Sequence, residues 1–193
     1  MKGLVYIFTG EGKGKTSAAL GVTLRMLLYG KKVAWISWYK SSRWRMSEMA
    51  LEKVFPRQIK MYWAGEGFFI EMPSEIVGGV KRANIKGGKV IDDRTRAEHV
   101  SAAENALEKA RDFLKNNEIE LLVLDEVVQA VNDKLISEDE IIDIIKKRGQ
   151  VHVILTGRGA DSRLSASADL VTEMKKIKHP YDVGHLAVKG LDY

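Results

Sequence analysis

A glycine-rich segment that ends in lysine and threonine is the part of this sequence best suited to chemistry. It follows an apolar run, residues 4–8, and reads Thr9-Gly10-Glu11-Gly12-Lys13-Gly14-Lys15-Thr16. The glycines let backbone N–H groups turn inward as a nest for phosphate oxygens, and the helical pattern that follows adds its N-terminal dipole. Lys15 supplies a cation and Thr16 a hydroxyl for Mg²⁺. The segment predicts an ATP phosphate-binding loop, although the usual pattern, G-x-x-x-x-G-K-[ST], has glycine where this chain has Thr9.

A pair of carboxylates supplies the second half of such a site. Asp125 and Glu126 follow four apolar residues, 121–124, which predict a strand buried in a sheet. Ligands of open α/β sheets bind at the carboxyl ends of the strands, so these side chains are expected beside the loop. One of them can complete a Mg²⁺ shell directly or through water. The predicted metal ligands are Thr16, Asp125 and Glu126.

The elements that must position these residues alternate between strand-like runs and helical patterns. The runs cover residues 4–8, 32–38, 59–63, 121–124, 151–156 and 170–174. Helices are predicted from capping patterns at Thr95 and Ser137, extending to about 116 and 147, and from Asp161 before a short helix around Leu164. The pattern predicts an α/β fold of the P-loop NTPase (RecA-like) kind, with a mostly parallel sheet of about six strands and helices on both faces.

One stretch, residues 63–94, shows no sustained period. It contains Pro73 and two glycine pairs, Gly78-Gly79 and Gly87-Gly88. We interpret it as a long loop, and long loops in compact domains usually carry function. The whole length, residues 1–193, fits one domain with room for a small appended flap.

Composition excludes several classes of protein. The chain has no cysteine, which excludes disulfides, thiolate metal sites and cysteine nucleophiles. The chain contains no run of about eighteen apolar residues, so no membrane span is predicted. The N-terminal residues lack a signal-peptide pattern, and a cytoplasmic location is therefore expected. The net charge of +5 comes from scattered cations, which favours a small polyanionic ligand over nucleic acid.

Four blocks of sequence together resemble the P-loop ATP:cob(I)alamin (corrinoid) adenosyltransferases nearly end to end. They are TGEGKGKTSAALG (9–21), LLVLDE (121–126), VILTGRGA (153–160) and ADLVTEMKKIKHPYDVGHLAVKGLDY (168–193). The family loop shares the threonine at its first position. The TGR and KHPYDVG segments are more specific than the phosphate loop alone.

The resemblance implies transfer of the 5′-deoxyadenosyl group of ATP to the cobalt of a reduced corrinoid, with release of triphosphate. The nucleophile then belongs to the substrate, so the protein positions the reactants and stabilises charge. The resemblance implies Lys15, Thr16 and Glu126 as catalytic residues. It implies a nucleotide site formed by residues 9–16 (Thr9, Gly10, Glu11, Gly12, Lys13, Gly14, Lys15 and Thr16). Arg158, just past the run 151–156, is a further candidate for this site; it could meet phosphate or corrin side chains, and a helix-capping role fits it equally well. Glu11, where the family has asparagine, is expected to point outward.

The corrinoid side departs further from the family pattern. Members carry a G-F-T-W segment after the third strand, whose aromatics cover the lower face of the corrin and help expel its axial ligand. This chain retains Gly67 and Phe68 but has Phe69 and Ile70 in place of threonine and tryptophan. Trp38, at a strand end, is the further candidate for a surface contact with the macrocycle.

Two other functions fit the same residues. A P-loop ATPase or phosphotransferase would use Glu126 as the base that activates water, and would release orthophosphate or ADP rather than triphosphate. A non-catalytic corrinoid or nucleotide carrier would bind without turnover. The resemblance also implies a homodimer and a reductase that delivers Co(I).

Overall fold

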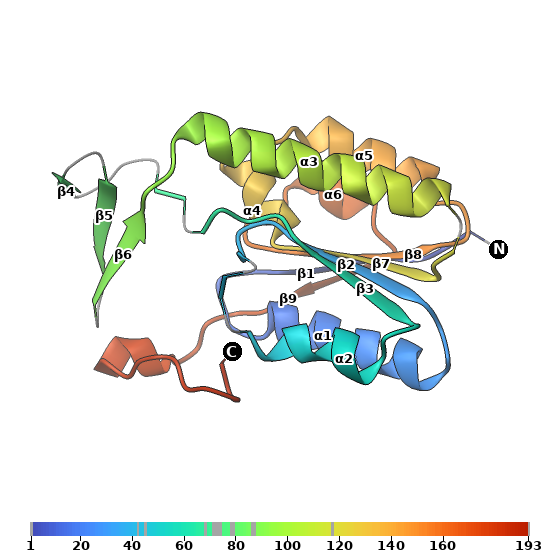
Figure 1. Cartoon of the computed structure of the whole chain (residues 1–193), viewed down its shortest axis with the longest axis horizontal. Helices are drawn as coiled ribbons and strands as arrows, with labels where there is room; N and C mark the ends of the chain where they lie inside the picture. The colour runs from blue at the N-terminus through green and yellow to red at the C-terminus, as the bar shows by residue number, and fades with distance from the viewer. Residues whose placement is uncertain are drawn as a thin grey trace.

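A six-stranded parallel sheet forms the centre of the molecule (Figure 1). The structure is a computed structural model that describes residues 2–41, 43–44, 46–67, 69–70, 75–77, 80–85, 88–116 and 118–192. All neighbouring strands of this sheet pair in parallel, which confirms the predicted fold class. The spatial order is β3 (Ile59–Trp63), β2 (Val33–Ser37), β7 (Leu121–Asp125), β8 (His152–Thr156), β1 (Val5–Thr9) and β9 (Leu170–Glu173).

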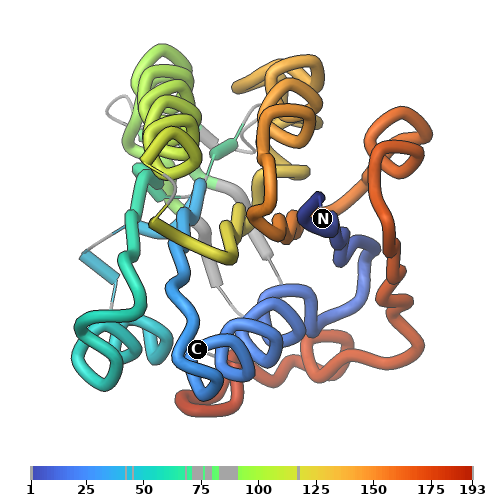
Figure 2. The backbone as a smooth tube through the Cα atoms, turned by 90° about the vertical axis from the view of Figure 1, so that its right-hand side faces the viewer, coloured from blue at the N-terminus to red at the C-terminus, as the bar shows by residue number. Residues whose placement is uncertain are grey.

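Helices cover both faces of the sheet, as Figures 1 and 2 show. One face carries α3 (Arg96–Lys115), α4 (Val127–Asn132), α5 (Glu138–Lys147) and α6 (Ser162–Ala166). The other carries α1 (Lys15–Leu28), the 3-10 turn η1 (Ser47–Ala50) and α2 (Leu51–Val54). Side chains alternate along each strand, so Ala34 and Ile36 join one core cluster while Val33 and Trp35 join the other. The core therefore lies on both sides of the sheet and holds its carboxyl edge in place.

The predicted helix starts are confirmed by their caps. Thr95 accepts a hydrogen bond from the backbone N–H of Glu98, and Ser137 accepts one from Glu140 in the same way. The side chain of Asp161 accepts from Leu164 N at 2.9 Å. Each cap satisfies a backbone donor that the first helical turn leaves free, so the sequence could locate these starts.

The prediction of a loop over residues 63–94 is wrong for much of that stretch. It contains a three-stranded antiparallel sheet of β4 (Glu75–Val77), β5 (Val80–Ile85) and β6 (Gly88–Asp92), which stands beyond the start of α3 (Figure 1). The missed signal was the pair of glycines between short runs rich in β-branched residues, which is typical of a hairpin. This small sheet ends at Asp92, close to the site described below.

The chain after β9 returns along the phosphate loop, on the side of the sheet that carries α1 (Figure 1). It includes the short 3-10 turn η2 (Pro180–Val183). Gly12 N donates to Met174 O at 2.5 Å, which ties this segment to the loop. In the part of the chain that is described, no helix has the length and apolar character needed to cross a membrane.

Candidate functional site

The loop between β1 and α1 lies at the carboxyl edge of the sheet and is held from two sides. Gly14, the residue before α1, has φ of 114°, a left-handed conformation that favours glycine. The hydroxyl of Thr9 accepts from Ala160 N at 3.2 Å, which joins the loop to the segment after β8. A glycine at this first position would lack that contact, so Thr9 has a structural role in this loop.

Lys15 lies across the inside of the loop. Its Nζ donates to Gly10 O at 2.7 Å and to Gly12 O at 2.8 Å. Burial lowers the pKa of Lys15, and the nearby charge of Arg158 lowers it further. Phosphate oxygens are stronger partners for an ammonium group than neutral carbonyls. A bound phosphate chain would therefore draw Nζ away from the two carbonyls.

Asp125 is the most completely bonded side chain of the site and is 0% exposed. Its Oδ1 accepts from the hydroxyls of Thr16 at 3.0 Å and Thr156 at 2.7 Å. Its Oδ2 accepts from Ser37 Oγ at 3.1 Å and Lys40 Nζ at 2.9 Å. Because the Thr16 hydroxyl donates to this carboxylate, its lone pairs face away from Asp125. Asp125 thus orients Thr16 and has no acceptor position left over for a direct metal bond.

Glu126 is the carboxylate that faces the open space beside the loop. It has φ of 64°, and its backbone N donates to Thr156 Oγ1 at 2.8 Å. Its half-buried side chain lines a pocket of about 400 Å³ together with Lys15 and Thr16. Burial and the adjacent charge of Asp125 raise the pKa of Glu126 to about 7. Of the two carboxylates, Glu126 is therefore the one that a ligand in the pocket can contact and whose protonation such a ligand can change.

Two buried residues of this pocket, Lys40 and Glu48, were missed by sequence reasoning. Lys40 Nζ lies 2.8 Å from Glu48 Oε1, and the two residues are only 7% and 6% exposed. Burial opposes the charge on Lys40, but the carboxylates of Asp125, Glu126 and Glu48 raise its pKa overall. The available signal was position, since Lys40 follows β2 at the same carboxyl edge of the sheet.

Cations dominate the entrance to the loop. Arg158 Nη1 pairs with Glu11 Oε2 at 2.8 Å, and Lys13 pairs with Asp192 near the C-terminus. Glu11 is 67% exposed, but it also lines the neighbouring pocket beside Arg158, so its direction relative to a bound phosphate stays a prediction. The 400 Å³ pocket and a neighbouring one of about 470 Å³ share four charged lining residues: Lys13, Lys15, Arg158 and Asp192. The loop residues and Arg158 are thus brought together around one polyanion-sized space.

The segment 65–70 starts on the other side of β2. Gly65 N donates to Lys40 O at 3.1 Å, and a Cβ at this glycine would lie 2.1 Å from the carbonyl carbon of Tyr39. Phe68 lies outside the described residues. Phe69 contacts His99 edge-on, with ring centroids 5.1 Å apart, and Ile70 is 9% exposed.

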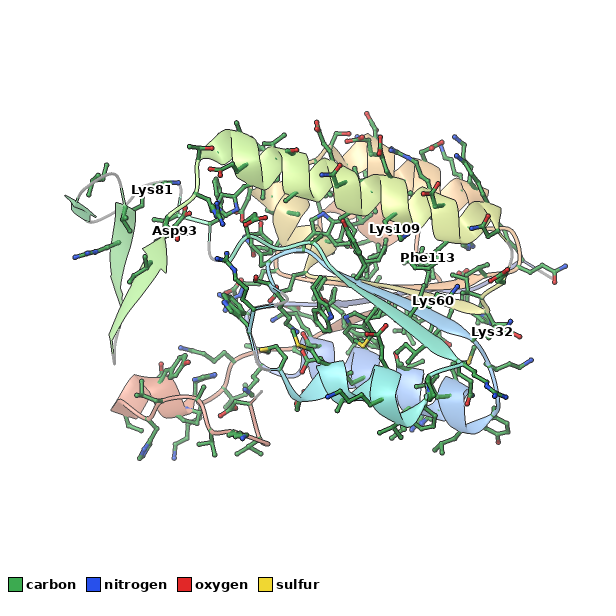
Figure 3. All side chains as sticks on the ribbon, in the orientation of Figure 1. Lys32, Lys60, Lys81, Asp93, Lys109 and Phe113 are labelled. Carbon is green, nitrogen blue, oxygen red and sulfur yellow. The ribbon has the colours of Figure 1, made fainter. Side chains whose placement is uncertain are left out.

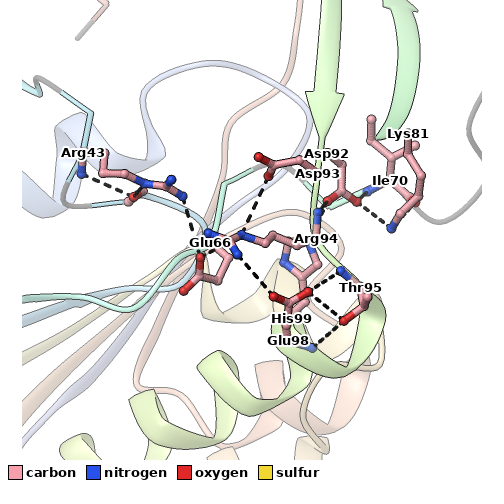
Figure 4. Close-up of polar contacts among 11 residues, drawn as sticks. Arg43, Glu66, Ile70, Lys81, Asp92, Asp93, Arg94, Thr95, Glu98 and His99 are labelled. Carbon is pink, nitrogen blue, oxygen red and sulfur yellow. Dashed lines mark hydrogen bonds and ion pairs between the residues drawn. The ribbon is translucent and has the colours of Figure 1, made fainter. Parts of the chain in front are cut away.

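Asp92, at the end of β6, anchors this segment (Figure 4). Its Oδ2 accepts from Ile70 N at 2.9 Å and Lys81 Nζ at 2.7 Å, and its Oδ1 accepts from Arg94 N at 3.0 Å. His99 Nε2 lies 3.0 Å from the same Oδ1. Although burial opposes it, the hydrogen bonds from His99 and Lys81 lower the pKa of Asp92 to about 2. An ionised Asp92 therefore fixes the backbone of Ile70 to the start of α3.

The expectation that Trp38 lies at the surface is wrong. Its side chain is 4% exposed and packs in the core cluster that contains Ala34 and Ile36. The reason is the two-residue period of β2, which continues past its last residue and points Trp38 to the same face. Its Nε1 has no hydrogen-bond partner among the described residues.

Comparison with known proteins decides the family. Residues 1–193 match the sequence profile of the family described as ATP:corrinoid adenosyltransferase BtuR/CobO/CobP. The chain belongs to this family. A corrinoid adenosyltransferase from a Sinorhizobium species is 32% identical across 100% of this chain and 81% of its own length. The Escherichia coli corrinoid adenosyltransferase is 28% identical across 100% of this chain and 86% of its own length.

A solved structure supports the fold of this adenosyltransferase. A KaiC-like protein from Pyrococcus horikoshii superposes with a TM-score of 0.54 at 17% identity, covering 91% of this chain and 74% of that chain. At that identity the likeness shows the α/β P-loop-like fold alone.

Lys40 connects the pocket beside the phosphate loop to the segment 65–70. Its ammonium group bonds Asp125 on the nucleotide side, and its backbone oxygen accepts from Gly65 on the other side. The predicted nucleotide residues therefore converge around the loop. Phe69 and Ile70 gather around Asp92 instead, on a separate set of contacts.

Proposed function

We propose that this adenosyltransferase moves the 5′-deoxyadenosyl group of ATP to the cobalt of a reduced corrinoid and releases triphosphate, in adenosylcobalamin biosynthesis or salvage. The observation that carries the proposal is the phosphate loop, with Lys15 inside it and Thr16 oriented by Asp125. Family membership supplies the corrinoid as the second substrate.

The chemistry asks the protein to bind a leaving group rather than to donate a nucleophile. The Co(I) electron pair forms a bond to C5′ of ATP while the C5′–O5′ bond breaks, and its electrons leave on triphosphate. Lys13, Lys15 and Arg158 line the space where that charge would collect. Preorganised cations and loop amides stabilise such charge without reorganising during the reaction.

We propose that Mg²⁺ accompanies the nucleotide, held by the Thr16 hydroxyl and by Glu126, with Asp125 orienting Thr16. The donor set fits, since Mg²⁺ prefers a few oxygen ligands together with phosphate and water. When bound, Mg²⁺ would neutralise part of the triphosphate charge. Glu126 lines the pocket beside Thr16, whereas Asp125 is saturated by four donors.

We propose that the corrinoid lies against the segment 65–70, with Gly67, Phe68, Phe69 and Ile70 as its contacts. Phe69 is half-buried and packs on the main core cluster, so it offers a supported apolar surface. Burial makes Trp38 a support beneath this region rather than a direct contact in the present conformation.

One assay tests the reaction. Chemically reduced corrinoid is mixed with MgATP, and the corrinoid spectrum and triphosphate release are followed together. The proposal expects both signals in equal amounts. The ATPase alternative is favoured by one observation, the Glu126 pKa of about 7, which suits a base. Orthophosphate or ADP without alkylated corrinoid would establish that alternative, and tight binding of both ligands without turnover would indicate a carrier.

We also propose a cytoplasmic homodimer that receives Co(I) from a separate reductase. The exposed apolar residues of edge strand β9, Leu170 and Val171, support an interface with a second copy. Light scattering of the purified chain tests this directly, since a monomeric mass at micromolar concentration would contradict it.

A further inference from the structure

A polar pocket of about 520 Å³ adjoins the segment 65–70. It lies between the end of β3 and the first turns of α3, and it is separate from the two phosphate pockets. Its polar lining includes two arginines, two glutamates and two neutral side chains: Arg43, Arg94, Glu66, Glu98, Ser101 and Asn105. Nothing in the nucleotide chemistry uses these residues.

The charges of this pocket cancel. Glu66 Oε2 lies 3.2 Å from Arg94 Nε and 3.7 Å from Arg43 Nη2. Arg94 Nη1 lies 3.2 Å from Glu98 Oε1. Figure 4 shows Glu66 between the two arginines. The two cations and two anions therefore leave no net charge, and Asp93, 3.8 Å from Arg94 Nε, adds a further carboxylate nearby.

Glu66 is held in this position by its neighbour. Gly65 lies against the backbone of Tyr39 and Lys40 and donates to Lys40 O, so the residue before Glu66 is tied to the segment after β2. Arg94 is fixed in turn by its backbone hydrogen bond to Asp92. Glu66 and Arg94 are only 37% and 31% exposed, so water screens their charges incompletely. The pocket is a built arrangement of donors and acceptors.

Such a pocket suits a primary amide better than a carboxylate. An amide can accept from an arginine N–H and donate to Glu66, which satisfies both kinds of group. A carboxylate accepts only, and it would lie beside the like charge of Glu66. Corrinoids carry acetic and propionic acid arms around the ring, and these are amidated to different extents in different corrinoids.

We propose that this pocket binds an amide-bearing edge of the corrin ring, and that Glu66 makes the enzyme prefer amidated corrinoids to those with free carboxylates. The inference rests on the proposed placement of the corrinoid against the segment 65–70. It assigns Glu66 as a specificity-determining residue and leaves the adenosyl transfer itself to the phosphate side.

The test compares two ring systems in the full-length protein. The dissociation constants of cob(II)inamide, whose arms are amides, and cob(II)yrinic acid, whose arms are carboxylates, are measured by tryptophan fluorescence. Glu66→Gln should strengthen the binding of cob(II)yrinic acid relative to cob(II)inamide by roughly tenfold, because one like charge is removed from a partly screened site. Glu66→Asp keeps the charge and should retain the amide preference.

Glu118→Gln is the matched control. It removes the same charge from the opposite end of the sheet, where Glu118 lies 3.8 Å from Lys60. Figure 3 labels Lys60 at that end, far from Asp93. An unchanged ratio in Glu66→Gln, or an equal shift in Glu118→Gln, would overturn the inference. A wild-type enzyme that forms no adenosylated product from either reduced corrinoid would instead overturn the proposed function.

Discussion

The phosphate loop and the segment 65–70, which we propose as the nucleotide side and the corrinoid side of the site, are built on different principles. The proposed nucleotide side uses a continuous loop, residues 9–16, with the Lys15 ammonium group bonded to the carbonyls of Gly10 and Gly12 inside it. The proposed corrinoid side is assembled from two segments, residues 65–70 and 92–98, which are joined by the ion pair of Glu66 with Arg94 and by the hydrogen bond from Ile70 N to Asp92. One side is defined by a motif and the other by a network of contacts.

This difference predicts how strongly a single substitution should affect each of the two regions. The phosphate loop should lose much of its affinity when Lys15 is replaced, because Lys15 is the cation bonded to the loop carbonyls. On the corrinoid side several residues together hold the segment 65–70. Single substitutions there are therefore expected to change the preference for one corrinoid over another, or the reactivity of the cobalt, before they abolish turnover. Lys40 is the exception, since it contacts Asp125 through its side chain and Gly65 through its backbone.

The largest expected effect is at Lys15. Lys15→Ala should reduce kcat/KM for MgATP by roughly 100-fold to 1000-fold, because a preorganised cation beside the departing triphosphate is lost. Steady-state rates and ATP binding by calorimetry measure this effect. Lys2→Ala removes a cation at an exposed position away from the loop and serves as the control. Full activity in Lys15→Ala would place the phosphate site elsewhere.

Substitutions at Asp125 and Glu126 should have different effects, the first on stability and the second on metal binding. Asp125→Asn should lower the free energy of unfolding by about 3 kcal/mol, because buried donors that include Lys40 lose an ionised partner. Glu126→Gln should not lower stability, because it removes a buried charge, and it should raise the Mg²⁺ concentration needed for half-maximal ATP binding. Denaturant unfolding and Mg²⁺ titrations compare the two variants. A reversed pattern, with metal dependence changed only in Asp125→Asn, would assign the metal carboxylate to Asp125.

The pKa of Glu126 predicts a pH dependence with a definite sign. The group titrates near 7 in the folded chain and near 4.5 when unfolded, so the folded state holds the extra proton between these values. The stability contribution of Glu126 is therefore fully present below pH 4.5 and is lost as the pH rises through 7. Mg²⁺ binding should strengthen over the same range, since the carboxylate must ionise. Both trends should disappear in Glu126→Gln, and their persistence would assign them to another group.

The nucleotide side could be predicted from the sequence more completely than the corrinoid side, because local patterns specify the first and long-range contacts the second. The parallel sheet, the loop and the caps at Thr95 and Ser137 follow from local patterns, and the structure has them where expected. Lys40 and Asp92 act through partners 85 and 22 residues away, and no local pattern indicates such pairs. Trp38 was misjudged because strand alternation continues past the end of β2. The resemblance to a family predicts that the segment 65–70 contacts the corrinoid, but it does not indicate which residues hold that segment in place.

The smallest expected effect tests the apolar surface on the corrinoid side. Reduction to Co(I) becomes accessible when Co(II) loses its lower axial ligand, so an apolar surface must replace that ligand and exclude water. Phe69 is the described aromatic of the segment, supported by His99 and the core. Phe69→Ala should slow the reaction from Co(II) corrinoid plus a mild reductant by roughly tenfold, since burying such a ring contributes about 2 kcal/mol.

The same variant should react normally with corrinoid already reduced to Co(I), and its ATP affinity should be unchanged because the phosphate loop is a separate element. Phe113→Ala is the matched control, since Phe113 is also half-buried on the same core cluster but lies at the opposite end of the molecule (Figure 3). It should lose stability without distinguishing the two cobalt states. Equal losses of Phe69→Ala with Co(II) and Co(I) would reduce Phe69 to a packing residue. No loss with either state would remove it from the corrinoid surface, and the contrast between the two halves of the site would then rest on Glu66 and Asp92 alone.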